Sequence, residues 1–297
     1  MAKIDKSQYT KEEWKVVREA RRQQKSAERA QKAQKKQEKL KDTERTEIVA
    51  VNQQPTISSS NLKNYIVCLK HGTKYGAEYV NNLYNMTQRH CTVPHEFVCF
   101  TDDIRDINPN IQIIHLKPGN GLSGWWYKPT FFDKNLQLTG NILYFDLDIV
   151  IHDNIDKLFT YNEGKFMICR DFNRSIRHDW NRMNSSVFRL QAGSLPWVYD
   201  TFIQNAPVHI RKFHGDQDWI FDQLKDKKNI WQFWPDNWIQ SYKWEMRDRN
   251  DLERDNGRRN FKHKAVPRIP KECCVAVFHG EPHPHQVEDD WVKENWK

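Results

Sequence analysis

Two carboxylates spaced two residues apart, Asp146 and Asp148, are the strongest chemical signal in this sequence. They directly follow the apolar run Ile142–Phe145, which has the composition of a buried strand. In extended backbone, residues two apart point to the same face, so both acids would face one crevice at the carboxyl end of the strand. Adjacent carboxylates repel each other unless a cation lies between them, and their oxygens suit Mg²⁺ or Mn²⁺, with phosphate oxygens completing the coordination. The alternative is a solvated strand end followed by an ordinary turn.

A second chemistry fits the same residues. Asp146 and Asp148 also match the nucleophile motif of haloacid-dehalogenase-type phosphatases, in which the first Asp attacks phosphorus. That fold normally places the motif on its first strand, whereas here a long stretch of strand and helix patterns precedes it. Asp216 could stand for the later acidic motif of that family. Ile220 and Phe221, however, occupy the positions where a second carboxylate is required.

Alternating strand and helix patterns must position these acids. The sequence predicts strands at 65–69, 97–100, 111–115, 141–145, 166–169, 186–190, 230–233 and 274–278. Helical spacing predicts helices at 75–89, 126–136, 194–204 and 217–225. This alternation predicts an α/β fold with a mostly parallel sheet flanked by helices. The charged, turn-rich stretch 247–264 is predicted to be an exposed loop.

The positive charge of the chain is concentrated near its N-terminus. Of the net charge of +8, residues 1–60 contribute 15 Lys and Arg against 9 Asp and Glu, while the rest has 32 against 30. Residues 1–45 are therefore predicted to be a basic helical or disordered arm, 46–61 a linker and 62–297 the globular domain. Because the basic excess is absent from the globular part, no specific nucleic acid partner is expected. The arm could make weak contact with an anionic surface.

The six cysteines show neither the paired spacing of a zinc site nor the density of a disulfide scaffold. Most lie in or beside apolar runs, so buried reduced thiols are expected. No run approaches the ~20 apolar residues that span a bilayer. The first residues lack the apolar core of a signal peptide. A cytoplasmic location is therefore expected.

Several further motifs occur in the order found in one enzyme family. They are a strand and turn at 69–78, a Lys-containing helix at 124–132, Asn-Ser-Ser at 184–186, Asp-Gln at 216–217 and His-Gly at 279–280. With the Asp146–Asp148 pair, this set resembles the retaining GT-A-fold glycosyltransferases of the glycogenin and lipopolysaccharide-galactosyltransferase type (family 8-like). The sequence is more similar still to a group of bacterial proteins assigned as glycosyltransferases from sequence alone. The resemblance runs from about Tyr65 to Trp296.

The resemblance implies a GT-A (Rossmann-like) domain and gives roles to particular residues. Three would bind the divalent cation, Mn²⁺ or Mg²⁺: Asp146, Asp148 and His279. Three would hold the donor sugar and stabilise the transition state: Asn184, Asp216 and Gln217. Asp216 could instead be a simple helix N-cap. The nucleotide and its diphosphate would contact Leu69, Tyr75, Asp103 and Lys128, with Tyr75 near the base ring.

The C-terminal motif departs from the family pattern at one functional position. Glu281 and His283 stand where the bacterial group usually has Lys, so the phosphate-binding lysine is missing from its expected place. The replacing charge would come from His283 or His285, or else from Lys243 or Lys128.

The resemblance therefore implies a metal-dependent glycosyltransferase that moves a hexose from a nucleotide-sugar donor, expected to be UDP-linked, to a hydroxyl acceptor, with retention. The acceptor would be a glycan, lipid or protein. Two alternatives stay open, a phosphatase with Asp146 as nucleophile and an inactive nucleotide-sugar-binding protein. An acceptor groove could be lined by the tryptophans clustered in one stretch, Trp231, Trp234, Trp238 and Trp244, although core packing would also explain them.

Overall fold

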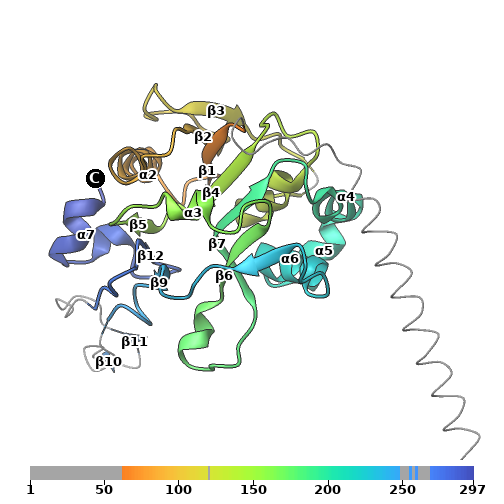
Figure 1. The fold of residues 1–297 in the computed structure, drawn as a ribbon. Coiled ribbons are helices and arrows are strands. Elements are labelled where there is room, and N and C mark those ends of the chain that lie inside the picture. Colours follow the sequence, from red (N-terminus) through yellow and green to blue (C-terminus); the bar gives the residue numbers. More distant parts are fainter. Residues whose placement is uncertain (1–61, 120, 248–253, 256–257, 260–267) are drawn as a thin grey trace, which may run out of the picture. The chain divides into compact units, whose positions relative to one another are not determined.

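The computed structural model describes residues 62–119, 121–247 and 268–297, and the backbone of 254–255 and 258–259. A seven-stranded sheet is its centre (Figure 1). The strands are β1 (Asn64–Lys70), β2 (Glu96–Thr101), β3 (Gln112–His115), β4 (Asn141–Phe145), β6 (Phe166–Arg170), β7 (Met183–Gln191) and β8 (Trp231–Phe233). Their order is β3-β2-β1-β4-β7-β6-β8. β7 runs antiparallel to β4 and β6, and the other neighbours are parallel, so the predicted α/β fold with a mostly parallel sheet is confirmed.

Both faces of this sheet are covered by other elements. Alternate side chains of a strand point to opposite sides, so each strand contributes to two cores. From β1, Ile66 and Cys68 join a core that includes α2 (Ala77–His90). Tyr65 and Val67 face the other core, to which η3 (Gly124–Phe132), α4 (Pro196–Gln204) and α6 (Asp216–Leu224) contribute. Figure 1 shows α2 on one side of the sheet and α4 and α6 on the other.

A second, three-stranded sheet brings distant parts of the chain together. It has the order β5-β12-β9, from β5 (Ile149–Ile151), β12 (Val275–Val277) and β9 (Ile239–Ser241). β12 is antiparallel to β5 and parallel to β9. Because β5 begins directly after the carboxylate pair, this sheet carries the C-terminal His-Gly motif to the carboxylates.

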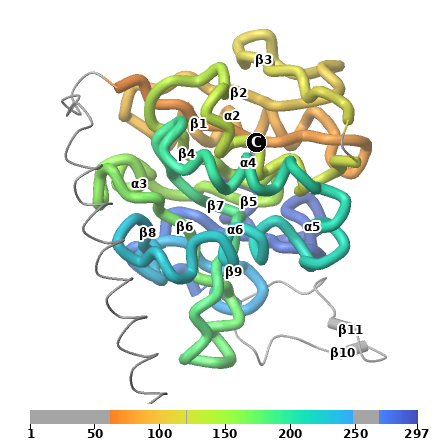
Figure 2. The backbone as a smooth tube through the Cα atoms, turned by 90° about the vertical axis from the view of Figure 1, so that its right-hand side faces the viewer, coloured from red at the N-terminus to blue at the C-terminus, as the bar shows by residue number. Residues whose placement is uncertain are grey.

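The remaining elements are short. They are α3 (Lys157–Thr160), α5 (Ala206–Lys212), α7 (Asp290–Asn295), the 3₁₀ helices η4 (Phe172–Ser175) and η6 (Pro284–Gln286), and the two-residue pair β10 (Arg254–Asp255) and β11 (Arg258–Arg259). The connection between β6 and β7, which contains η4, projects away from the sheet (Figure 2). Most of the predicted loop 247–264, and all of the predicted arm and linker, lie outside the described residues.

One predicted helix is wrong in type and length. The stretch 126–136 was expected to be an α-helix, but the structure has a 3₁₀ helix that ends at Phe132. Pro129 lies inside it, and proline removes the backbone donor that an α-helical turn would use. This 3₁₀ helix contains Lys128, so its backbone conformation determines where that side chain lies.

All six cysteines are free thiols, and five of them are buried. Among the described residues, none of the helices combines the length and apolar character needed to cross a membrane.

Candidate active site

A cleft of about 490 Å³ opens at the carboxyl ends of β1 and β4. Because β7 runs in the opposite direction, it begins at the same edge of the sheet. Most of the predicted site residues line this cleft, namely Leu69, Tyr75, Lys128, Asp146, Asp148, Asn184, Asp216, Gln217 and His279. Asp103, Lys243 and His283 do not line it.

The carboxylate pair lies in a short turn that connects the two sheets. The backbone N–H of Asp146 donates to the Ser186 carbonyl at 2.8 Å, which ties it to β7 in the large sheet. The Asp148 carbonyl accepts the N–H of Phe278 at 2.9 Å, which ties it to the end of β12 in the small sheet. The turn is therefore fastened at both ends.

A buried lysine lies between the acids of two motifs. The Lys128 ammonium is 2.8 Å from Asp146 Oδ1 and 3.7 Å from Asp216 Oδ2, and it also donates to Ser185 Oγ at 3.1 Å. Its side chain is 5% exposed, so these contacts replace its hydration. The hydroxyl of Tyr144 adds a further donor to Asp146 Oδ1, at 2.7 Å. Lys128 thus links the end of β4 to the start of α6 through ion pairs, and β7 to both through a hydrogen bond.

Burial and nearby charges both shift the pKa values of the groups in this cleft. Burial disfavours the Lys128 ammonium, but Asp146 and Asp216 outweigh it, so the pKa of Lys128 is raised. Burial also raises the pKa of Asp216, against the effect of Lys128. Burial, with the nearby Asp146 charge, raises the pKa of Asp148 to about 6. Negative charge is therefore concentrated in the cleft, and one buried ammonium compensates only part of it.

Tyr75 contacts the carboxylate pair directly. Its hydroxyl donates to Asp148 Oδ2 at 2.9 Å, and burial together with the Asp148 charge raises the pKa of Tyr75. The resemblance placed Tyr75 beside a nucleotide base. In this structure its ring packs against Tyr79 at 4.7 Å, and its hydroxyl holds an acid in place.

The predicted sugar-binding residues lie together at the start of β7 and of α6. Asn184 donates from Nδ2 to Gln217 Oε1 at 3.3 Å, and its own Oδ1 accepts the N–H of Ser186. Asp216 is the first residue of α6 and is 4% exposed. Its Oδ2 is buried and accepts no hydrogen bond from the described residues, although Lys128 is near.

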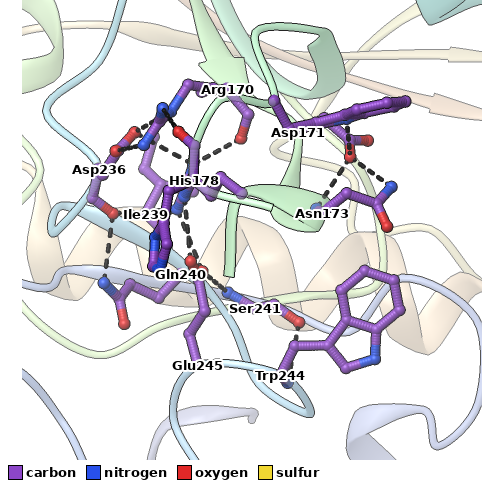
Figure 3. Close-up of polar contacts among 12 residues, drawn as sticks. Arg170, Asp171, Asn173, His178, Asp236, Ile239, Gln240, Ser241, Trp244 and Glu245 are labelled. Carbon is purple, nitrogen blue, oxygen red and sulfur yellow. Dashed lines mark hydrogen bonds and ion pairs between the residues drawn. The ribbon is translucent and has the colours of Figure 1, made fainter. Parts of the chain in front are cut away.

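His279 lines the cleft and is held from behind. Its Nε2 forms a 2.7 Å hydrogen bond with Ser241 Oγ, and its ring stacks on Phe172 at 5.1 Å. Ser241 is fixed in turn, because its N–H donates to Glu245 and its Oγ accepts the N–H of Trp244 (Figure 3).

The network behind Ser241 is charged and mostly buried. Arg174, 4% exposed, donates to both carboxylate oxygens of Glu245 and to the Ile239 carbonyl. Beside it, Arg170 pairs with Asp236 (Figure 3). Sequence patterns did not reveal this support for His279, because its members come from β6, η4 and the region of β9.

The carboxylate oxygens fit a divalent cation. Within the described part of the chain, Asp146 Oδ2 and Asp148 Oδ1 accept no hydrogen bond, whereas the other oxygen of each acid is engaged. Two carboxylate oxygens in one cleft are hard, negatively charged ligands of the kind Mg²⁺ and Mn²⁺ take. No described group of three or more His, Cys, Asp or Glu side chains has the arrangement of a metal centre. The third ligand expected from His279 therefore remains a prediction.

The predicted residues outside the cleft have other partners. Asp103 pairs with Arg105 at 2.7 Å, which lowers the pKa of the carboxyl. Lys243 donates to the Glu281 carbonyl at 2.9 Å. The His283 ring is 5.6 Å from that of Tyr75, and its pKa is lowered, first by burial and then by the charge of Lys74.

Several cleft residues were not among the predicted site residues, including Tyr144, His214, Asp218, Lys74 and Trp125. Lys74 is exposed, lines the cleft and has its Nζ 4.7 Å from the centre of the Tyr75 ring. Trp125 also lines the cleft and is 53% exposed. Lys74 directly precedes Tyr75 in the sequence, and Trp125 lies three residues before Lys128, so both are sequence neighbours of predicted site residues.

The tryptophan groove proposed from sequence is not part of this cleft. Trp231 and Trp234 are buried in the core, and Trp238 and Trp244 are half-buried against it. Trp244 contributes indirectly, because its ring meets that of His279 at 4.7 Å.

Neither a protein-family model nor a curated protein matches the sequence. Solved structures match the fold. An active-site mutant of LgtC gives a TM-score of 0.51 at 12% identity, over 77% of this chain and 93% of LgtC. The glycosyltransferase GlyE of Streptococcus pneumoniae TIGR4 gives 0.51 at 12% identity, over 79% of this chain and 62% of GlyE. The galactosyltransferase LgtC in complex with donor and acceptor sugar analogs gives 0.48 at 13% identity, over 74% and 88%. The chain therefore has the GT-A glycosyltransferase fold that the motifs predicted.

Proposed function

We propose that this chain, which has the fold of LgtC and GlyE, is a metal-dependent glycosyltransferase that moves a hexose from a UDP-linked donor to a hydroxyl acceptor, with retention. The observation that carries the proposal is the convergence of the Asp146–Asp148 turn, buried Lys128 and the Asn184–Gln217 pair in one cleft at the strand ends. Such a cleft offers both a place for a diphosphate and hydrogen-bonding groups for a sugar.

Asp146 and Asp148 would hold the cation, with His279 as the third ligand. When bound, the cation supplies positive charge to the diphosphate leaving group. Tyr75 would keep Asp148 oriented through its hydroxyl, and Tyr144 would do the same for Asp146. Because a hydrogen bond fixes one oxygen of each acid, the side-chain rotamer of each acid is restricted, and its second oxygen would be available to the cation.

A second positive charge for the diphosphate would come from Lys74. Among the residues that line the cleft, the lysines are Lys74 and Lys128, and there is no arginine. Lys128 is buried and committed to Asp146 and Asp216, whereas Lys74 is exposed and forms no ion pair with a described residue. Lys243, which already donates to a carbonyl outside the cleft, is the weaker candidate.

The donor sugar would lie over Asn184, Asp216 and Gln217. Asn184 and Gln217 share a 3.3 Å hydrogen bond, and their remaining donors and acceptors would bind sugar hydroxyls. Asp216 keeps a buried, unbonded oxygen near Lys128 and would stabilise positive charge that develops at the anomeric carbon. The phosphatase alternative has no support here, since buried Ile220 fills a position where it needs a carboxylate.

Thermal unfolding with UDP tests the proposal. UDP should raise the melting temperature when Mn²⁺ is present and have little effect without it, because the acids repel the diphosphate unless a cation compensates them. Asp148→Asn should abolish the UDP effect, whereas Asp153→Asn, a change at an exposed acid beyond β5, should keep it.

Turnover is then measured as UDP release from a panel of UDP-hexoses. Release of UDP that requires Mn²⁺ and disappears in Asp148→Asn is the expected result. Binding of UDP with no release from any donor would instead favour the inactive binding protein.

A further inference from the structure

Trp125 has an unusual position for a tryptophan in this chain. Among the tryptophans of the described residues, Trp125 alone is exposed, at 53%, and it lies in the wall of the cleft. Its neighbour Trp126 is 6% exposed and stacks on Phe202 of α4 at 5.8 Å. Trp126 therefore anchors η3 in the core, which leaves Trp125 facing the cleft.

The indole of Trp125 lies beside the start of α6. A Cβ placed on Gly215 would be 3.8 Å from Trp125 Nε1, which is ordinary van der Waals contact. Gly215 directly precedes Asp216 and Gln217, so the indole is next to the residues proposed to hold the donor sugar. Exposing this much aromatic surface costs free energy unless a ligand covers it.

Polar groups surround this aromatic surface. His214 and Asp218 line the same part of the cleft, and Asp218 is held by Arg182 at 2.9 Å. The Arg182 guanidinium lies over the Phe221 ring at 4.2 Å, so its orientation is restrained. One flat apolar surface with fixed acceptors and donors beside it is the pattern that suits a sugar ring, which has an apolar C–H face and a rim of hydroxyls.

We infer that Trp125 is the stacking platform of an acceptor subsite, and that the acceptor is a carbohydrate bound through a pyranose ring. This rests on the proposed function. The depth of the cleft separates the two sugars: Asn184 and Asp216 are 7% and 4% exposed, so the donor hexose lies deep, whereas the half-exposed indole meets a ring that enters from solvent. The polar neighbours His214 and Asp218 disfavour a lipid chain at the same place.

Acrylamide quenching of tryptophan fluorescence tests this directly. The protein is loaded with Mn²⁺ and UDP and titrated with methyl pyranosides and disaccharides of glucose, galactose and N-acetylglucosamine. At least one saccharide should reduce the quenching of the wild-type protein, and the reduction should be absent in Trp125→Phe, since buried tryptophans contribute equally in both. Trp197→Phe, a change at a half-buried tryptophan outside the cleft, should keep the protection.

A kinetic measurement gives a second readout. Trp125→Ala should raise the acceptor KM about tenfold, the loss of one stacked aromatic contact, on the order of 1.4 kcal/mol. Its UDP-dependent thermal shift should match that of the wild type, which shows that the variant folds and binds the donor nucleotide. Trp125→Phe should recover most of the acceptor affinity.

Three results would overturn the acceptor subsite. Protection by a UDP-hexose with no added saccharide would make Trp125 a donor platform. Stronger protection by a long-chain alcohol than by any saccharide would indicate a lipid acceptor. UDP binding with no protection by any saccharide would refute the subsite while leaving the proposed function intact. Conversely, saccharide protection without any UDP effect would refute the proposed function and leave a sugar site at Trp125.

Discussion

The cleft has two sides that differ in how their charges are satisfied. The floor, made of buried Lys128, Ser185 and Asp216 with partly buried Asp146, has ion pairs and hydrogen bonds among its own members. The open wall, made of Lys74 and Trp125, is exposed. A buried charge must find its partner within the protein, whereas an exposed one is satisfied by water until a ligand replaces the water. The floor should therefore contribute to folding and to catalysis, and the wall to ligand binding alone.

The largest expected effect is on the floor. Lys128→Met leaves buried Asp216 and partly buried Asp146 without their cation, so the free energy of unfolding should fall by about 3 kcal/mol, and transfer should be lost. Urea denaturation measures the first and UDP release the second. Lys63→Met is the matched control, because the Lys63–Glu96 pair is equally short, 2.9 Å, but exposed; it should leave the midpoint nearly unchanged. Equal effects of the two substitutions would contradict the conclusion that burial makes the ion pairs of Lys128 important for stability.

A smaller effect is expected on the wall. Lys74→Met should weaken UDP binding about tenfold, on the order of 1.4 kcal/mol, because one charge facing the diphosphate is lost. The urea midpoint should stay unchanged, since the ammonium is exposed. Calorimetric titration with UDP and with uridine separates the contribution of the diphosphate to binding from that of the nucleoside. Uridine should bind equally to the wild type and to Lys74→Met. If Lys243→Met lowers UDP affinity and Lys74→Met does not, the assignment of the phosphate-binding lysine passes to Lys243.

The smallest expected effect concerns His152, a histidine outside the cleft whose burial affects stability alone. Burial lowers the pKa of His152 to about 4, and its Nε2 is buried without a hydrogen bond to the described residues. As the pH falls below the ordinary pKa of about 6.5, the unfolded chain takes up a proton that the folded protein excludes, so stability decreases. Between about pH 7 and about pH 6 the loss should be about 0.7 kcal/mol.

Denaturation of His152→Phe across this pH range provides the measurement. The phenyl ring keeps the contact with Trp291 and cannot be protonated, so the variant should lose less stability in acid than the wild type. His115→Gln, a change at an exposed histidine on β3, should reproduce the wild-type pH profile. An unchanged pH profile in His152→Phe would show that other groups cause the acid sensitivity.

Much of the large sheet could be predicted because its strands are locally encoded. Ile142–Phe145 and the runs around Ile66 and Phe97 are apolar on both faces, as buried parallel strands must be. The position of the acids followed from the same pattern, since they come where an apolar run ends. Lys128, Asn184 and Gln217 were named through the family resemblance, and all three line one cleft, while their roles there stay a prediction.

What could not be predicted depends on contacts between distant segments. The strand β9 is only three residues long, and its partner β12 comes much later in the chain. The hydrogen bond from the Tyr75 hydroxyl to Asp148 joins residues far apart in the sequence, and nothing in the segment around Tyr75 indicates it. Ser241 and Glu245, which hold His279, likewise carry no local signal. Periodicity reports which side of an element is buried and leaves the partner undefined.

The turn that carries the acids also has a mechanical consequence. Asp146 is fastened to the seven-stranded sheet through Ser186, and Asp148 to the three-stranded sheet through Phe278. Any shear of one sheet past the other must therefore change the separation of the two carboxylates. Substitutions that loosen the packing between the two sheets, for example at residues that contact β5, should therefore change the distance between the two carboxylates, even when they lie far from the cleft.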